Sequence, residues 1–118
     1  MDKTYKLITL LIITFMIISC GESNPPITKI VVKSDRVGVL LDTEDPKIIA
    51  DLQTIFYEKE ERPDAGPEFR YFIDFTIDGN SERWQYSEDG HIRSFESAFT
   101  MIYQLRDVAE FNKIAKIR

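Results

Sequence analysis

Cysteine and histidine are nearly absent from this chain of 118 residues, which has Cys20 and His91 as its single examples. One cysteine cannot form an intrachain disulfide, and a zinc site of cysteine and histidine ligands lacks enough donors. The five glycines are scattered, so there is no glycine-rich phosphate loop, and the Gly-x-Ser-x-Gly pattern of a nucleophile elbow is also missing. The sequence therefore predicts a protein that is not an enzyme and that holds no metal or dissociable cofactor.

Basic residues are outnumbered by acidic residues. The chain has 15 lysines and arginines against 20 aspartates and glutamates, for a net charge of −5. Nucleic acids and anionic lipid surfaces bind positively charged faces. We therefore expect no nucleic acid among the partners of this protein.

Long hydrophobic runs are limited to one segment near the N-terminus. Residues 7–18 form an apolar run interrupted only by Thr9 and Thr14, and Lys3 and Lys6 precede it. A helix needs about 20 apolar residues to span a bilayer, so this run is short for a membrane anchor. A positive start followed by a short apolar run is typical of a secretory signal peptide.

The segment Ile17-Ile18-Ser19-Cys20-Gly21 resembles the lipobox of bacterial lipoproteins, and the resemblance covers residues 1–21. It implies cleavage before Cys20, diacylation of the Cys20 sulfur with palmitate-type chains, and acylation of the new amino group. The alternative is an uncleaved short membrane helix with an incidental cysteine. Gly21, in place of aspartate, resembles lipoproteins sent to the periplasmic side of the outer membrane when the host is diderm.

The chain divides into three parts on this interpretation. Residues 1–19 are the signal peptide, residues 20–26 are the lipidated cysteine and its tether, and residues 27–118 are one domain. The signal peptide carries a net charge of +1, so the remaining chain carries −6. Six tether residues, two of them proline, reach about 20 Å when extended, which keeps the domain close to the membrane.

The first half of the domain predicts two strands and a helix. Residues 27–33 and 36–41 are rich in β-branched and aliphatic side chains around a Ser34-Asp35 turn, and Gly38 indicates a bulge or a close backbone contact. Asp45 and Pro46 are typical of a helix start, and apolar residues at helical spacing predict a helix over about 46–58. Residues 58–67 read as a charged loop.

The second half begins with the clearest structural pattern in the chain. Residues 68–78 alternate with period two, which places Phe69, Tyr71, Ile73, Phe75 and Ile77 on one face of a half-buried strand. A hairpin turn at 78–79, a return strand over 82–87 and a short strand over 91–94 follow. Residues 95–105 favour a strand over a helix, and the capping box at 107–110 starts a final helix.

Together these elements predict an α+β fold. We expect an antiparallel sheet of about five to six strands with two helices packed on one face, in the order β-β-α-β-β-β-β-α. The apolar stripe of the first helix and the aromatic face of residues 68–78 should bury each other, because neither is stable in water.

Such a sheet leaves its second face open, and this face is our candidate binding surface. Antiparallel sheets often face water, so an ordinary solvated face is the alternative interpretation. Arginine and aromatic side chains are enriched at the energetic centres of protein interfaces. The residues expected on the open face are Arg70, Phe72, Asp74, Thr76, Arg83, Gln85, His91 and Arg93.

The function that this pattern favours is a non-enzymatic, lipid-anchored, protein-binding module of the bacterial cell envelope. The alternative is a small-molecule or lipid carrier with an aromatic-lined pocket between the sheet and the helices. Three weaker hypotheses remain: serine–histidine–aspartate catalysis at His91, a carboxylate pair of Asp74 and Asp78, and a metal site in the charged loop formed by Glu58, Glu60, Glu61 and Asp64.

Overall fold

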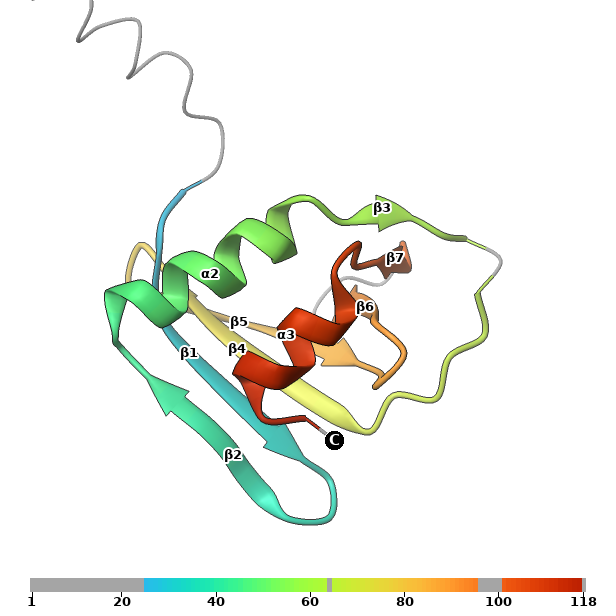
Figure 1. Cartoon of the computed structure of the whole chain (residues 1–118), viewed down its shortest axis with the longest axis horizontal. Coiled ribbons are helices and arrows are strands. Elements are labelled where there is room, and N and C mark those ends of the chain that lie inside the picture. The colour runs from blue at the N-terminus through green and yellow to red at the C-terminus, as the bar shows by residue number, and fades with distance from the viewer. Residues whose placement is uncertain (1–24, 64, 96–100, 118) are drawn as a thin grey trace, which may run out of the picture.

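The structure, a computed structural model, describes residues 25–63, 65–95 and 101–117. It contains one antiparallel sheet with strand order β2-β1-β4-β5-β6-β7-β3, and both helices cover the same face of it (Figure 1). The predicted α+β class and the two helices are confirmed, with seven strands rather than five to six. The elements are β1 (Ile27–Ser34), β2 (Gly38–Thr43), α2 (Pro46–Tyr57), β3 (Glu60–Glu61), β4 (Tyr71–Ile77), β5 (Asn80–Tyr86), β6 (His91–Ser94), β7 (Tyr103–Gln104) and α3 (Val108–Ala115).

The centre of the sheet is the pair formed by β1 and β4, which are distant in sequence. Val32 pairs with Ile73 and Ile30 pairs with Phe75, and all four side chains are fully buried beneath the helices. Because side chains alternate along a strand, the residues between them point to the opposite face of the sheet. This alternation separates a dry core from the open face.

The hairpin of β1 and β2 turns on Ser34, whose hydroxyl accepts hydrogen bonds from the backbone N–H groups of Arg36 (3.1 Å) and Val37 (3.4 Å). Gly38 closes this turn with a φ of +90°, and a Cβ at this position would contact nothing within 4 Å. The predicted bulge lies instead at Leu40, opposite the step from Val32 to Lys33. The expectation for Gly38 is therefore wrong, because Gly38 pairs regularly with Ser34 and takes the positive φ that the turn requires.

The first helix follows its sequence signals closely. The Asp45 side chain caps α2 by accepting a hydrogen bond from the Lys47 N–H (2.9 Å), and Pro46 occupies the first helical position. Phe56 lies near the other end of α2. Its ring centroid is 4.4 Å from that of Phe75 and 5.0 Å from that of Trp84. The predicted burial of the helix stripe against the aromatic strand face is confirmed.

The hairpin of β4 and β5 also has the predicted turn. Asp78 and Gly79 have φ values of 50° and 78°, the left-handed pair that a two-residue hairpin requires. On the returning strand Tyr86 is fully buried, whereas Trp84 is half-buried against the core.

Two short strands extend the sheet beyond the predicted ones. Part of the charged loop forms β3, in which Glu60 pairs with Gln104 and Glu61 with Tyr103 of β7. The strand favoured for residues 95–105 is confirmed at Tyr103–Gln104, whereas residues 96–100 lie outside the described part of the chain. Elements of two residues are too short to produce a period that a sequence pattern can show.

The last helix is held on the sheet by one apolar face. Asp107 caps α3 by accepting from the N–H of Glu110, as the capping box predicted, and Phe111 and Ala115 are fully buried. Lys116 ends the helix in the left-handed conformation, with a φ of 63°. Within the described ranges, neither helix has the length and apolarity needed to cross a membrane.

Candidate binding surface on the open sheet face

The open face has two rows of paired residues that run across the strands. Residues paired in register on neighbouring strands project to the same side of the sheet. One row crosses β1, β4 and β5 as Val31, Asp74 and Arg83, and Phe95 extends it because its N–H bonds to the Arg83 carbonyl (2.9 Å). The second row crosses β1, β4, β5 and β6 as Lys33, Phe72, Gln85 and Arg93.

Asp74 is the electrostatic centre of this face. Its carboxylate accepts two hydrogen bonds from Arg83, from Nε (2.8 Å) and from Nη2 (3.0 Å), and the Lys33 ammonium lies 3.5 Å away. The Asp74 side chain is 15% exposed. The hydrogen bonds from Arg83 hold the pKa of Asp74 below its usual range, against the opposing effect of burial. A bidentate pair of this kind fixes the direction of the arginine side chain.

Two aromatic rings lie beside the Asp74–Arg83 pair. The Phe72 and Phe95 rings meet edge to face with their centroids 6.0 Å apart, and the Arg83 guanidinium lies 5.3 Å from the Phe72 centroid. Phe95 is 54% exposed, which is unusual for a ring of this size. The ion pair, the arginine stacking and the ring pair form one continuous cluster.

Arg93 extends the cluster toward β6. Its Nε donates to Gln85 Oε1 (2.7 Å), and its guanidinium lies 4.6 Å from the centroid of the Phe69 ring. The prediction that Phe69 shares the buried face of β4 is therefore wrong. Strand β4 begins at Tyr71, so Phe69 lies outside the ladder and its side chain does not follow the strand alternation.

Three of the predicted residues lie at the margins of the surface. Thr76 pairs with Lys29 and Ser81 at the far end of β4, while Arg70 precedes β4 and its Nη2 lies 2.7 Å from Glu68 Oε1. His91 points to the open side, but it is engaged with the turn before it. The structure therefore brings five of the eight predicted residues into one cluster: Phe72, Asp74, Arg83, Gln85 and Arg93.

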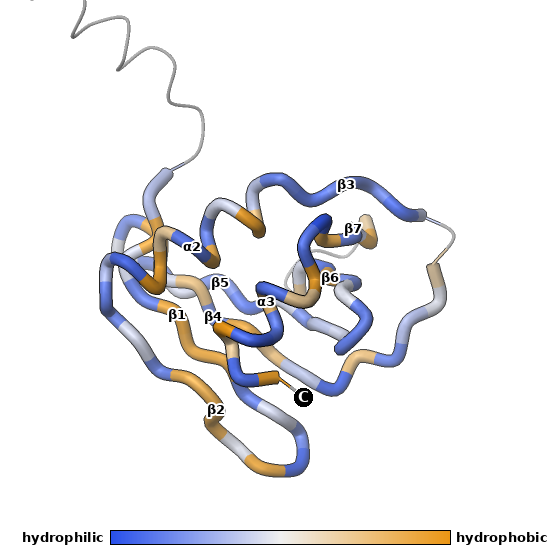
Figure 2. Tube along the Cα trace, viewed as in Figure 1, coloured by the Kyte–Doolittle hydropathy of each residue, from blue (hydrophilic) through white to orange (hydrophobic). Residues whose placement is uncertain are grey.

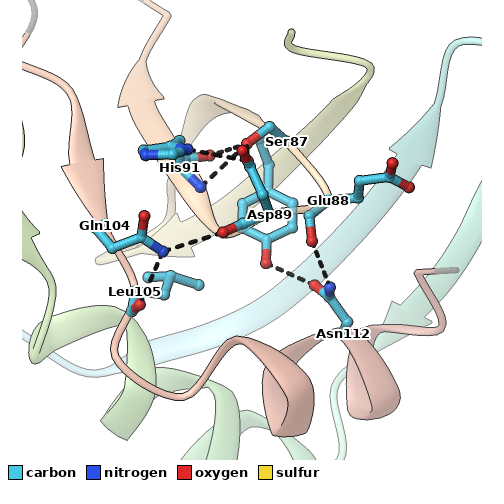
Figure 3. Close-up of polar contacts among 8 residues, drawn as sticks. Ser87, Glu88, Asp89, His91, Gln104, Leu105 and Asn112 are labelled. Atoms are coloured by element: carbon cyan, nitrogen blue, oxygen red, sulfur yellow. Dashed lines mark hydrogen bonds and ion pairs between the residues drawn. The ribbon is translucent and has the colours of Figure 1, made fainter. Parts of the chain in front are cut away.

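The side chains of Ser87, Asp89 and His91 stabilise the turn between β5 and β6 and are not arranged as a catalytic triad (Figure 3). The hydroxyl of Ser87 donates to Asp89, and the Nδ1 atom of His91 lies 2.9 Å from the same carboxylate. The carboxylate thus stands between serine and histidine, whereas a triad needs the imidazole against the hydroxyl as its base. The backbone N–H of His91 also donates to the Ser87 hydroxyl (3.1 Å), as in a side-chain-closed turn.

The same turn is fastened to α3 and β7. Tyr86 Oη donates to Asn112 Oδ1 (2.6 Å), while Asn112 Nδ2 donates to the Glu88 carbonyl (2.8 Å). Gln104 Nε2 donates to the carbonyls of Asp89 and Leu105, both at 3.1 Å (Figure 3). These bonds fix the end of β6 that borders the open face. Burial raises the pKa of Tyr86 well above its usual range, so the hydroxyl stays protonated as a donor.

A lysine lies among four aromatic rings on the helix side of the sheet. The Lys59 ammonium is 4.1 Å from the Phe56 centroid and 5.8, 5.3 and 5.1 Å from those of Tyr57, Trp84 and Tyr103. Burial lowers the pKa of Lys59, against the opposite influence of the Glu82 carboxylate. The ammonium lies over the edge of the aromatic core where α2 ends, in cation–π contact with the rings.

The acidic loop is engaged in ion pairs. Glu60 lies 3.3 Å from Arg62 and 3.6 Å from Arg106, measured between the charged oxygens and nitrogens. In the residues that the structure describes, no three histidine, cysteine, aspartate or glutamate side chains are grouped to hold a metal ion. Asp64, the fourth acid of the metal hypothesis, lies outside those residues. Asp74 is bound to Arg83, so it does not face Asp78 as a carboxylate pair.

Side chains fill most of the space between the sheet and the helices, where fifteen buried apolar residues of the described ranges form one core cluster. A groove of about 670 Å³ remains between the sheet and α3, where the β1–β2 hairpin and Tyr71 of β4 approach the C-terminal end of that helix. Its walls include Val37, Val39, Leu40, Tyr71 and Ile117.

Sequence reasoning missed four members of the open face. Val31 and Lys33 follow the strand alternation of β1, so extending the same period-two argument to that strand would have found them. Phe95 has the same parity as His91 and Arg93, so extending the alternation of β6 by one residue would have found it. Phe69 precedes β4, and the strand alternation places it on the wrong face. Phe95 joins the cluster because β6 ends just before it and its backbone continues alongside β5.

Comparison with known proteins adds no relative: no family model, no curated protein and no solved structure matches this chain.

Proposed function

We propose that this protein is a lipid-anchored component of the bacterial cell envelope whose domain binds another envelope protein through the open sheet face. Cys20 carries the lipid, and no catalytic step is assigned to the domain. In a host with two membranes, we place the protein on the periplasmic side of the outer membrane.

The observation that carries this proposal is the cluster of Phe72, Phe95, Arg83 and Asp74. Arginine and aromatic side chains dominate the energetic centres of protein interfaces. The bidentate ion pair and the edge-to-face ring contact already hold these side chains in place. Less side-chain entropy is then lost when a partner docks.

The packing of the interior supports a binding module over a carrier. A carrier needs a cavity that encloses most of its ligand. Here the core cluster, with Phe56 against Phe75, fills the centre of the space between the sheet and the helices. The groove beside α3 is open at the surface and does not enclose a ligand.

The test is covalent capture of the partner in intact cells. A tagged wild-type protein is cross-linked and purified beside the Phe72→Ser/Phe95→Ser double variant. We expect one dominant envelope protein with the wild type and at least about a tenfold loss with the variant, because removing hot-spot aromatics costs about 2 kcal/mol or more. Lys47→Ser, an exposed position on α2, is the matched control and should capture normally.

A second measurement separates loss of binding from loss of folding. Circular dichroism of both variants should match that of the wild type, because Phe72 and Phe95 lie outside the buried core. The proposal fails when the double variant, correctly folded, captures the same protein at the wild-type level.

A further inference from the structure

The two edges of the sheet are built differently. One edge is β3, which has two residues, both glutamate. The other edge is β2, which has six residues, GVLLDT, with Asp42 as its single charge and no proline. Proteins blunt sheet edges with short strands and charged residues, because an edge presents free backbone N–H and C=O groups. Strand β3 follows that rule, whereas β2 has as its protection only the bulge at Leu40 and the charge of Asp42.

The open edge also displays apolar side chains. Val37 is 76% exposed and Val39 is 58% exposed, which makes them the two most exposed large apolar residues among those described. Figure 2 shows the hydrophobic stretch of β2 at the outside of the molecule, with no helix beyond it. Within the described ranges, β2 pairs with β1 alone.

The groove adjoins this edge and carries positive charge. Besides its apolar walls, it is lined by Lys113 and Lys116 of the α3 end. In the part of the chain that the structure covers, no carboxylate lies within ion-pair distance of either ammonium. Two unpaired lysines in a domain of negative net charge mark a local site for carboxylates.

The position of the groove favours a partner protein over the anchoring membrane. Strand β1 begins at Ile27, directly after the tether, and the β1–β2 turn lies at its other end (Figure 1). Eight strand residues span about 26 Å. The groove is therefore at the end of the sheet farthest from the attachment point of the chain.

We infer that β2 and the adjoining groove bind an extended segment of a partner protein, which adds to the sheet as an eighth strand. Its backbone pairs with the free edge of β2, its apolar side chains enter the groove between Val39 and Ile117, and its carboxylates meet Lys113 and Lys116. Strand addition of this kind takes affinity from main-chain hydrogen bonds and specificity from pockets for alternate side chains. Val39 pairs with Lys33 of the open sheet face, so this surface borders that face, but it does not include the cluster of Phe72, Asp74, Arg83 and Phe95.

The test uses two synthetic peptides of about seven residues, a typical strand length. One alternates valine with glutamate, and the other alternates valine with lysine. Each is titrated by fluorescence anisotropy into the full-length protein in phosphatidylcholine nanodiscs, with empty nanodiscs as the blank. We expect the glutamate peptide to bind about tenfold more tightly, because two exposed ion pairs contribute up to about 1 kcal/mol each.

Three variants locate the site. Lys113→Gln/Lys116→Gln should remove most of the preference for glutamate, whereas Lys47→Gln, an exposed lysine on α2, should leave it unchanged. Val37→Lys/Val39→Lys should abolish binding of the glutamate peptide, because charge on an edge strand blocks strand pairing. All substituted side chains are exposed, so the fold should persist.

Amide hydrogen exchange gives the readout specific to strand addition. The bound peptide should slow exchange at amides of Gly38–Thr43 that face away from β1. The inference is overturned by equal or absent binding of the two peptides, by protection elsewhere, or by binding that survives Val37→Lys/Val39→Lys. A concentration-dependent homodimer abolished by that variant would identify a second copy as the occupant and would also overturn it. Phe72→Ser/Phe95→Ser should leave peptide binding intact, so this result is independent of the proposed function.

Discussion

At the residue scale, Asp74 holds the charged side chains of the candidate surface in position. It is the acceptor for Arg83 and Lys33 together, and the same arginine stacks on Phe72. Removing this carboxylate therefore releases a guanidinium and an ammonium at once. A partner that recognises the ordered cluster should be sensitive to that loss, even where the partner never touches Asp74 itself.

We predict that Asp74→Asn lowers the free energy of unfolding by about 1–2 kcal/mol at neutral pH, the usual contribution of a charge-assisted hydrogen bond. The hydrogen bonds from Arg83 lower the pKa of Asp74 in the folded protein. The stabilisation is therefore fully present above the unfolded-state pKa and is lost as the pH falls through the folded-state pKa. Urea unfolding over a pH series should show the two proteins converging in acid. A constant difference at every pH would contradict this explanation.

The sequence predicts some of the residues on the open face. Alternation alone placed Phe72, Asp74, Arg83 and Gln85 together, because each lies inside a strand of seven residues. Phe69 was misplaced because the period-two argument was carried past the first residue of β4. Phe95 follows the alternation of His91 and Arg93, but its contact with Phe72 requires that the pairing with β5 continue past the end of β6, which the local sequence does not show.

At the element scale, long elements with strong end signals were predictable. Helix α2 has a cap at Asp45, a proline at its start and an apolar stripe, and the structure has all three. Strands β3 and β7 stabilise each other over two residue pairs. Their pairing is a tertiary event between segments about 40 residues apart, so the local sequence carries no periodic signal for it.

The turn between β5 and β6 provides an element-scale prediction. Gly90 has a φ of +93°, and a Cβ built there would clash with a methyl carbon of Val108 on α3. Gly90→Ala should therefore push α3 away from the turn and lower the free energy of unfolding by about 1–3 kcal/mol, the usual cost of overpacking. Thermal unfolding followed by circular dichroism measures the change.

Gly66→Ala is the matched control for that experiment. A Cβ at Gly66 meets nothing within 4 Å, so its melting temperature should stay close to that of the wild type. Equal stability of the two variants would show that the contact between Gly90 and α3 is not tight in solution.

At the scale of the whole molecule, the proposed lipid anchor would place both proposed binding surfaces at a membrane. We predict that Cys20→Ala abolishes incorporation of an alkyne-labelled palmitate and leaves the precursor uncleaved, because the lipobox requires the cysteine sulfur. Gel mobility and membrane fractionation measure cleavage and partitioning. Ser19→Ala keeps a small residue before the cysteine and should be processed normally. Unchanged labelling or processing in Cys20→Ala would contradict the lipoprotein assignment.

The pairing of β1 with β4 also governs how the domain folds. Ile27 pairs with Ile77, about 50 positions later, and β2, α2 and β3 all lie within that loop. The β4–β5 hairpin, by contrast, closes over a two-residue turn and can form in microseconds. We therefore expect the hairpin to form first and the docking of β1 to limit the folding rate, because closing a long loop costs entropy before its contacts form. Since β1 also pairs with β2 over a short turn, the slow step would be the docking of that hairpin on β4. If Cys20 is lipidated as proposed, the strand that follows the tether would be the last to dock on β4.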